Sequence, residues 1–330
     1  SVAAAKRLVA AALARGPLDV RAVAVTGSGR EAVATVLRAA YPDAADRIVV
    51  ANEIIAHATA AIRQDPHRGR SLSVVEIGGQ DAKFIQISGG QIVESDMNRA
   101  CSAGTGSVLE EQAKCYGIDD VREFVRRARE ARRPPDLGQM CTVFVAEAAA
   151  EALNEGFTLS DVFGGFQYSV VHNYIHRVMS HRVFGETIFF QGKPASGPSL
   201  AWTLAAVTGR EVLVPDNPGA MGAWGIGLLA REERRGALEG AATLDLARFG
   251  ESRIVESRDF QCHEPRCATL CRIEKTTVEG PGGARTVYNG GACPKYEIST
   301  AERPKLPLEA PSAFDEREAL LAPFVAGAPG

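Results

Sequence analysis

Several features are missing from this chain of 330 residues, and each absence excludes a class of protein. No apolar run approaches the roughly 20 residues that span a bilayer, which argues against a transmembrane helix. The formal net charge of −3 gives no overall attraction to nucleic acid or to anionic membranes. The first stretch, SVAAAKRLVAAALARG, lacks the apolar core and cleavage site of a signal peptide, so we expect a cytoplasmic protein.

The seven cysteines do not fit a disulfide framework, because their number is odd and no export signal is evident. Three lie in mid-chain and four in the C-terminal quarter. Metal or redox chemistry is the natural interpretation of such a placement, whereas isolated cytosolic cysteines are usually small buried apolar side chains. We assign that second role to Cys115, which lies in an ordinary helical pattern.

Strand and helix patterns alternate along the first 240 residues or so, in a composition that is 45% hydrophobic and 23% charged. The strand patterns tend to end at glycines, which predicts an α/β fold with largely parallel pairing and ligands at the carboxyl ends of strands. Predicted strands lie at 21–25, 46–51, 186–192 and 211–215, with two or three antiparallel strands between 74 and 96. Predicted helices lie at 2–15, 31–40, 52–64, 107–116, 119–132, 144–155, 160–181, 198–209 and 220–236.

The stretch VVEIGGQDAKFIQISGGQIV (74–93) carries polar chemistry where one strand turns into the next. Adjacent glycines allow backbone N–H groups to approach phosphate oxygens closely. A β-hairpin with a glycine bulge and exposed polar residues explains the motif equally well. The functional hypothesis assigns phosphate binding to Gly78, Gly79 and Lys83, and catalysis to Gln80 and Asp81. Gln80 would orient a water molecule, and Asp81 or Glu76 would hold Mg²⁺ through water.

Three further glycine loops lie at strand-to-helix junctions, in CSAGTGSVLEEQA, FFQGKP and NPGAMGAWGIG. Each loop alone is typical of a turn or a close helix contact. Together they favour one nucleotide-binding cleft, because amides at a helix N-terminus attract anions and ligands gather at strand ends. The residues that we assign to nucleotide binding in these loops are Gly104, Thr105, Gly106, Gly192, Lys193 and Gly222.

These motifs, in their order along residues 20–230, resemble the BadF/BadG/BcrA/BcrD-type ATPases, the activators of 2-hydroxyacyl-CoA dehydratases and ATPase components of benzoyl-CoA reductases. The matching segments include VTGSGR, NEIIAHA, VVEIGGQDAKFI, MNRACSAGTGSVLEEQA, MCTVFVAEAAAEALNEG, YSVVHNYIHRV, IFFQGKP and VLVPDNPGAMGAWGIGLLA. CSAGTG and CTVF are the most diagnostic of them. The resemblance implies an actin-like, ribonuclease-H-like α/β ATPase fold, whose two related halves close over ATP or ADP with Mg²⁺.

The same resemblance implies a homodimer with one [4Fe-4S] cluster at the subunit interface, held by Cys101 and Cys141 of each chain. The residues agree with this hypothesis, because a cluster requires four thiolates and a twofold axis supplies the second pair. Both cysteines also precede predicted helices, whose N-terminal amides favour thiolate. Two structural thiols are the alternative.

The function implied by the resemblance is ATP-coupled, low-potential electron transfer through that cluster. A ferredoxin or flavodoxin would be the donor, and an iron–sulfur 2-hydroxyacyl-CoA dehydratase or benzoyl-CoA reductase the acceptor. Nucleotide would act by binding two conformations unequally. Glu53 and His57, one turn apart on a predicted helix, would lie near the domain interface, with a solvated or core pair as the equal alternative.

The chain departs from the family pattern in its phosphate loops. Family members usually begin with a strand bearing Asp-x-Gly-Ser-Thr-Thr-x-Lys, which these 330 residues do not contain, so we expect the first strand meander of the N-terminal half to be missing. Glu76 stands where Asp is usual, and Lys193-Pro194 replaces a glycine and a small residue. A second hypothesis is therefore a degenerate, non-hydrolysing scaffold that holds nucleotide and clusters, as a homodimer or beside a paralogous subunit. A sugar or acid kinase of the same fold would not explain Cys101 and Cys141.

The C-terminal quarter carries the pattern Cys-x4-Cys-x3-Cys-x21-Cys, formed by Cys262, Cys267, Cys271 and Cys293. Four cysteines in a segment poor in apolar residues indicate a metal centre in place of a core. The spacing favours a second [4Fe-4S] cluster over zinc, which usually binds Cys-x2-Cys pairs, and unliganded thiols are a further alternative. We predict three regions: 1–72, a remnant of the first actin-like half; 73–240, the second half with a cluster-binding helical insertion; and 241–330, a cysteine-rich metal-binding extension and tail.

Overall fold

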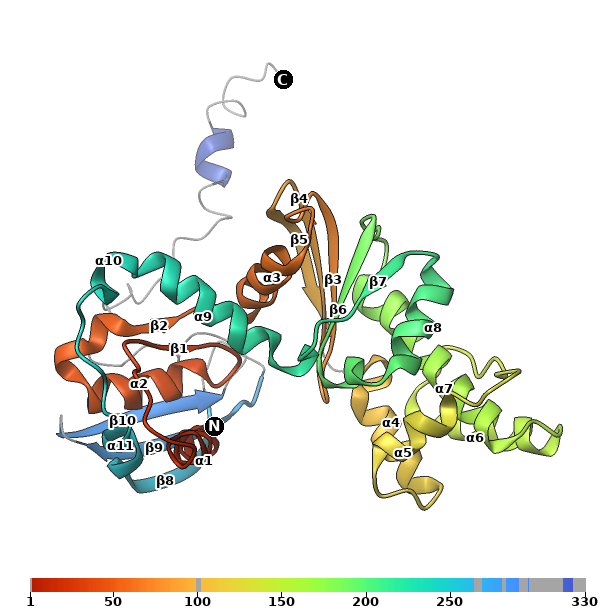
Figure 1. Ribbon diagram of the computed structural model, residues 1–330, viewed down its shortest axis with the longest axis horizontal. Coiled ribbons are helices and arrows are strands. Elements are labelled where there is room, and N and C mark those ends of the chain that lie inside the picture. The colour runs from red at the N-terminus through yellow and green to blue at the C-terminus, as the bar shows by residue number, and fades with distance from the viewer. Residues whose placement is uncertain are drawn as a thin grey trace. The chain divides into compact units, whose positions relative to one another are not determined.

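The computed structural model describes residues 2–98, 102–263, 269–280, 283–290, 296 and 317–322 (Figure 1). The chain divides into two compact units, Ser1–Glu251 and Ser252–Gly330. Within the described residues, no helix has the length and apolar content needed to cross a bilayer.

The main sheet of the first unit has five strands in the order β5–β4–β3–β6–β7, which are drawn near the centre of Figure 1. Three of them form the antiparallel meander predicted between residues 74 and 96, and two are added in parallel on the other side of β3. The α/β class is therefore confirmed, with parallel pairing on one side of the sheet only. The strands are β3 (Ser71–Ile77), β4 (Ala82–Ser88), β5 (Gln91–Met97), β6 (Thr187–Gln191) and β7 (Glu211–Leu213).

Both faces of this sheet are covered, so β3 is buried along almost its whole length. Side chains alternate between the two faces of a strand. Val75 and Ile77 consequently join the core formed with the helices of residues 106–208, whereas Leu72 and Val74 join the core on the opposite face. The helices on the first face are α4 (Gly106–Cys115), α5 (Val121–Ala128), α6 (Thr142–Asn154), α7 (Leu159–Tyr174) and α8 (Pro198–Thr208).

The opposite face is covered by two helices that pack against each other, α3 (Glu53–Gln64) and α9 (Met221–Glu233). They approach so closely that a Cβ atom at Gly225 would lie 1.8 Å from the carbonyl oxygen of Ala56. Helix α9 also contacts β1, so the helix pair connects the five-stranded sheet with the N-terminal part of the unit. That part contains α1 (Val2–Leu13), β1 (Val23–Val25), α2 (Arg30–Ala40), β2 (Ile48–Val50), α10 (Arg235–Leu238) and α11 (Ala247–Glu251), with β1 and β2 paired in parallel.

Two predicted helices end earlier than their sequence pattern indicates. Helix α5 ends at Ala128 because the following loop is held elsewhere: Asp161 accepts the backbone N–H groups of Arg132 and Arg133, each at 2.8 Å. A hydrogen bond from the hydroxyl of Thr158, together with these amides, lowers the pKa of the Asp161 carboxyl to about 2. Helix α7 continues beyond its end as a π-helical turn, Ile175–Met179, a rare geometry that often occurs near functional sites.

The second unit contains an antiparallel sheet that the sequence patterns did not predict. Its order is β10–β9–β8, with β8 (Arg253–Gln261), β9 (Arg272–Gly280) and β10 (Gly283–Gly290). Charged residues occupy many positions of these strands, and all of β8 except its half-buried Phe260 is exposed, which hides the usual alternation of apolar and polar side chains. Ile273 and Val278 on β9 are buried.

The contact between α3 and α9 yields a test with a control on the same helix. Gly225→Ala places a methyl group against the backbone of α3 and is expected to lower the free energy of unfolding by about 1–3 kcal/mol. Gly227→Ala adds the same atom in open space, so it is expected to raise stability by about 0.5–1 kcal/mol through helix propensity. Urea unfolding measures both, and a Gly225→Ala protein as stable as Gly227→Ala would contradict the packing.

Candidate functional site

The turn between β3 and β4 is formed by residues 78–81 and presents backbone donors to solvent. The N–H of Gly78 closes the turn by donating to the carbonyl oxygen of Asp81 at 2.8 Å. Gly79 and Gln80 are exposed, and no hydrogen bond within the described part of the chain uses either of their backbone N–H groups. A Cβ atom at Gly79 would meet nothing within 4 Å. Consecutive free amides of this kind form a concave anion site.

The N-terminus of α4 fixes the orientation of this turn. The N–H of Gly106 donates to the carbonyl oxygen of Gly78, and the N–H of Ser107 donates to that of Gly79, both at 2.8 Å. These two helix amides are therefore engaged by the protein, and they hold the turn carbonyls away from the free N–H groups. The hydroxyl of Thr105 is also used within the loop, since it donates to Ser102 O at 2.7 Å.

The predicted loop after β6, in FFQGKP, packs directly against the β3–β4 turn. Gly192 has φ +93°, and a Cβ atom there would lie 1.9 Å from the carbonyl oxygen of Ile77. A Cβ atom at Gly106 would lie 2.7 Å from Pro194 Cγ, so this loop and α4 also meet without room for a side chain. The side chain of Lys193 is exposed beside them. The structure thus brings the β3–β4 turn, the start of α4 and the loop after β6 together at the carboxyl ends of β3 and β6.

Gly104 is placed differently from the other predicted nucleotide residues. A Cβ atom there would lie 3.0 Å from the backbone nitrogen of Tyr174 on α7. The missing side chain at this position therefore serves the close approach of the loop to α7.

A buried ion-pair cluster lies behind the turn. The ammonium of Lys83 is 2.9 Å from Glu76 Oε2, 2.8 Å from Asp81 Oδ2 and 3.6 Å from Glu53 Oε1. Glu76 and Lys83 face each other across β3 and β4, so the strand register itself forms the pair. The side chains of Lys83 and Glu76 are 4% and 7% exposed, whereas that of Asp81 is 50% exposed. Lys83 is therefore engaged by carboxylates rather than free to meet a phosphate.

Burial and charge oppose each other in this cluster. Burial lowers the pKa of Lys83, but the attraction of Glu76 and the hydrogen bonds to Asp81 and Glu76 outweigh it and raise the pKa overall. Burial raises the pKa of the Glu76 carboxyl, and the charges of Lys83 and His57 offset only part of that rise. Lys83 is therefore the neighbour that most favours the ionised form of Glu76.

Helix α3 contributes two more polar side chains to the same region. His57 Nδ1 lies 2.5 Å from Gln191 Oε1, and a Cβ atom at Gly222 would lie 3.0 Å from His57 Nε2. His57 thus lies between the end of β6 and the start of α9, and Glu53 faces Lys83, so neither is simply solvated. Gln191 is fully buried and was missed from the sequence. Its signal was available: it is a polar residue at the buried end of a strand, immediately before a glycine.

The carboxylates do not form a ready-made metal cage. In the part of the chain that the structure describes, no group of three or more His, Cys, Asp or Glu side chains is arranged to hold a metal ion. Lys83 already provides a cation for Glu53, Glu76 and Asp81. The exposed half of the Asp81 carboxylate fits a hydrated Mg²⁺, an ion that usually keeps several of its waters.

Cys141 occupies the N-cap position at the start of α6 and is exposed. The nearby backbone N–H groups of Phe144 and Val143, with a smaller attraction from Arg177, lower the pKa of its thiol. The side chains of Val143 and Phe144 are exposed beside it. A thiol that favours thiolate at an exposed helix N-terminus has the chemistry of a metal ligand. Cys101, the other predicted cluster ligand, lies outside the described residues.

The end of α7 joins the Cys141 loop to the ion-pair cluster. Asn173 Nδ2 donates to the carbonyl oxygen of Met140, next to Cys141, at 3.2 Å. The hydroxyl of the adjacent, fully buried Tyr174 donates to the carbonyl oxygen of Lys83 at 2.8 Å. Two consecutive residues of α7 thus contact the Cys141 loop and the ion-pair cluster.

Two of the four C-terminal cysteines are described. The N–H of Cys262, just after β8, donates to the carbonyl oxygen of Cys271, just before β9, at 2.8 Å. This bond brings the two cysteines to the same end of the strand pair. Cys267 and Cys293 lie outside the described residues.

The dependence of Glu76 on Lys83 gives a prediction with a pH signature. Lys83→Met keeps the side-chain length but leaves Glu76 without its cation, so the free energy of unfolding is expected to fall by about 3–5 kcal/mol. A carboxyl whose pKa is raised by folding contributes stability below its unfolded pKa and loses that contribution as the pH rises through its folded pKa. The loss of unfolding free energy in Lys83→Met, relative to the wild type, is therefore expected to grow with rising pH.

Urea unfolding between pH 4 and pH 8 measures this deficit. Lys114→Met, at an exposed position of α4, is the control and is expected to change stability by less than about 0.5 kcal/mol. Equal effects of the two substitutions would contradict the stabilising role of the Lys83 ion pairs.

Comparison with known protein families matches residues 2–230 to the BadF/BadG/BcrA/BcrD ATPase family. Among curated proteins, the 2-hydroxyisocaproyl-CoA dehydratase activator of Clostridioides difficile is 28% identical over 221 residues, which cover 66% of this chain and 76% of that protein. The activator of lactoyl-CoA dehydratase of Anaerotignum propionicum is 29% identical over 164 residues, 48% of this chain and 61% of that protein.

Solved structures show the same relationship. The activator of the 2-hydroxyisocaproyl-CoA dehydratase from Clostridium difficile, with bound ADPNP, is 26% identical and has a TM-score of 0.56 over 69% of this chain and 79% of its own. Component A of the Acidaminococcus fermentans (R)-2-hydroxyglutaryl-CoA dehydratase is 24% identical, with a TM-score of 0.54 over 64% and 76%. The fold is therefore that of the actin-like ATPases. Because the family match covers more than half of the sequence, this chain belongs to the BadF/BadG/BcrA/BcrD ATPase family.

Proposed function

We propose that this chain is an ATP-dependent activator that passes a low-potential electron to an acyl-CoA dehydratase or a benzoyl-CoA-reductase-type partner. The observation that carries the proposal is Cys141, an exposed thiol of lowered pKa at the N-terminus of α6. Relatives named as activators of 2-hydroxyisocaproyl-CoA and lactoyl-CoA dehydratases support it.

Nucleotide binding is proposed at the β3–β4 turn. The free N–H groups of Gly79 and Gln80 would receive a phosphate group, and the exposed carboxylate of Asp81 would bind a hydrated Mg²⁺. The exposed Gln80 carboxamide would orient an attacking water, and Lys193 would meet a second phosphate. The solved relative with bound ADPNP supports a nucleotide site in this fold.

Cluster binding is proposed at Cys141 with Cys101, in a homodimer whose partner supplies the other two thiolates. A [4Fe-4S] cluster there would supply a one-electron couple. The α6 amides would stabilise its negative charge, and the exposed Val143 and Phe144 would be covered by the second copy. The donor would be a ferredoxin or flavodoxin, and the acceptor an iron–sulfur enzyme acting on a CoA thioester.

Coupling between the nucleotide site at the β3–β4 turn and the cluster site at Cys141 is proposed to run through α7. Tyr174 holds the carbonyl oxygen of Lys83, and Asn173 holds the loop before Cys141. Lys83 in turn contacts Asp81 of the turn and Glu53 of α3. A nucleotide that binds two arrangements of the turn unequally would shift α7 and the surface around Cys141.

A second candidate is a nucleotide-binding scaffold without turnover. The position of Lys83 favours it, because an inner-sphere Mg²⁺ at Glu76 would have to displace the ammonium. A phosphate-release assay separates the two candidates. Release stimulated by Mg²⁺ and the partner supports the activator, whereas tight ADP binding without release supports the scaffold.

A further metal centre is proposed at the C-terminal cysteines, with a [4Fe-4S] cluster favoured over zinc. The backbone bond between Cys262 and Cys271 supports it by holding two of the four predicted ligands at one strand end. Metal analysis of Cys271→Ser tests this centre separately from the one at Cys141.

The cluster proposal predicts the iron content of anaerobically purified protein. Cys141→Ser is expected to lose about two iron atoms per chain relative to the wild type, because one four-iron cluster would serve two chains. It is also expected to lose the EPR signal of that cluster. Cys115 is exposed, so the expectation of a buried apolar thiol there was wrong. Cys115→Ser is expected to keep both the iron and the signal. Iron content indifferent to Cys141 would overturn the activator proposal.

A further inference from the structure

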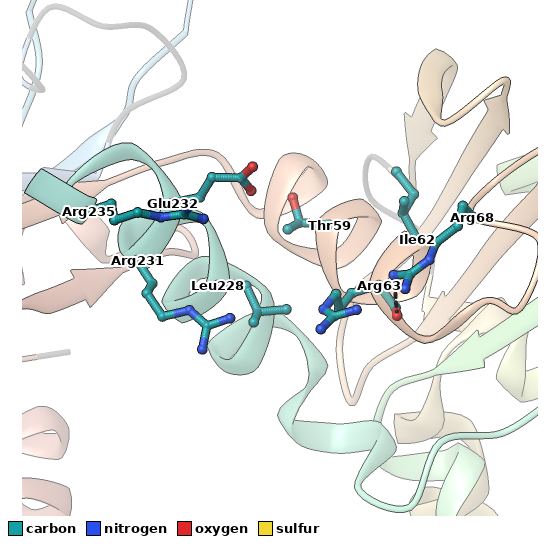
Figure 2. A pocket seen from close by; sticks show the side chains of 8 residues that line it. All are labelled: Thr59, Ile62, Arg63, Arg68, Leu228, Arg231, Glu232 and Arg235. Atoms are coloured by element: carbon teal, nitrogen blue, oxygen red, sulfur yellow. Dashed lines mark hydrogen bonds between the residues drawn. The ribbon is translucent and has the colours of Figure 1, made fainter.

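A hollow lies between α3 and α9, with a volume of about 410 Å³ (Figure 2). None of its lining residues belongs to the candidate nucleotide site. Its lining comes from the C-terminal halves of both helices, the loop after α3 and the first residue of α10. The lining residues are Thr59, Ile62, Arg63, Arg68, Leu228, Arg231, Glu232 and Arg235. Glu53, His57 and Gly222, which belong to the candidate nucleotide site, lie at the opposite ends of the same two helices.

The charge of this hollow is unbalanced. Four guanidinium groups line it with a single carboxylate, that of Glu232. Among the described residues, none of these five charged side chains forms an ion pair with any other. The one hydrogen bond drawn in Figure 2 runs from Arg68 Nη1 to the carbonyl oxygen of Arg63, at 3.1 Å. All five of these residues are exposed, so solvent weakens the repulsion between the arginines, and a bound anion would offset what remains.

Helix electrostatics explain only part of this arrangement. Arg63 and Arg231 lie in the last turns of α3 and α9, where cations interact favourably with the helix dipole. Arg68 lies outside any helix, and Arg235 is the first residue of α10, the helix end at which a cation is disfavoured. Helix dipoles therefore favour the positions of only two of the four arginines.

The positions of the arginines indicate what kind of anion fits. Figure 2 shows Arg63 and Arg231 on either side of Leu228, with Arg68 beyond Arg63 and Arg235 beyond Arg231. One pair thus comes from the α3 side and one from the α9–α10 side. A planar guanidinium matches two phosphate oxygens at once. An anion with two phosphoryl groups could engage one arginine pair with each group.

We propose that this hollow binds a small molecule that carries a diphosphate, with one phosphoryl group held by each arginine pair. Its volume lies in the range of small-molecule sites. Ile62 and Leu228 form an apolar part of the wall, against which the rest of an organic diphosphate would pack. Free pyrophosphate and an organic diphosphate share the recognised group. Because the ligand contacts both helices, it would also tie the C-terminal half of α3 to that of α9.

Isothermal titration calorimetry with pyrophosphate tests the proposal on the full chain. The double variant Arg63→Gln/Arg231→Gln removes one guanidinium from each side, and the Kd for pyrophosphate is expected to rise at least about tenfold. Arg234→Gln removes one positive charge at an exposed neighbour that does not line the hollow, and its Kd is expected to stay within about twofold of the wild type. Orthophosphate, which engages one pair only, is expected to bind at least about tenfold more weakly than pyrophosphate.

Three results would overturn the proposal: no binding of pyrophosphate to the wild type, equal binding by the wild type and the double variant, or orthophosphate binding as tight as pyrophosphate. Thermal unfolding checks the fold of each variant, and the single change Arg235→Gln gives a second test if the double variant is unstable. Titration with ADP distinguishes the sources of the diphosphate. Loss of one of two ADP-binding events in the double variant supports an organic diphosphate, whereas loss of pyrophosphate binding alone supports the free anion.

Discussion

The buried ammonium of Lys83 is the interaction on which the candidate site depends. It joins β4 to Glu76 on β3, to Asp81 in the turn and to Glu53 on α3, and three carboxylates would otherwise repel one another there. An unpaired buried charge is strongly destabilising, so the strands, the turn and the helix must move together or lose this pairing. The same residue accepts the Tyr174 hydroxyl through its backbone carbonyl, which extends the constraint to α7.

This arrangement gives the turn and the Cys141 loop a common support. The turn carbonyls are engaged by α4, which leaves the amides of Gly79 and Gln80 outward, while Asn173 holds the backbone next to Cys141. A rigid helix with contacts at both places is the kind of element through which ligand binding at one place changes the other. The π-helical turn that follows α7 interrupts its regular hydrogen bonding just beyond these contacts.

Much of the fold was predictable because strands such as SLSVVEI and TIFFQ carry apolar residues on both faces and are followed by glycines. The convergence of three glycine loops also followed from their positions at strand ends. The pairing of Lys83 with Glu76 could not be predicted, because a strand pattern alone does not give the register between two strands. Gly104 was assigned to nucleotide but contacts Tyr174, since a glycine motif does not distinguish ligand contact from helix contact. The β8–β10 sheet was missed because its exposed charged residues hide the period of two.

Hydrogen exchange measured by mass spectrometry, with and without ADP and Mg²⁺, tests the central claim most directly. The claim is that the free amides of the β3–β4 turn receive the phosphates of a nucleotide. Slower exchange in peptides that cover residues 76–83 is the predicted result, accompanied by slower exchange at 192–195, where the adjoining loop packs against the turn. Unchanged exchange at the turn under saturating nucleotide, or protection confined to other parts of the chain, would contradict the account.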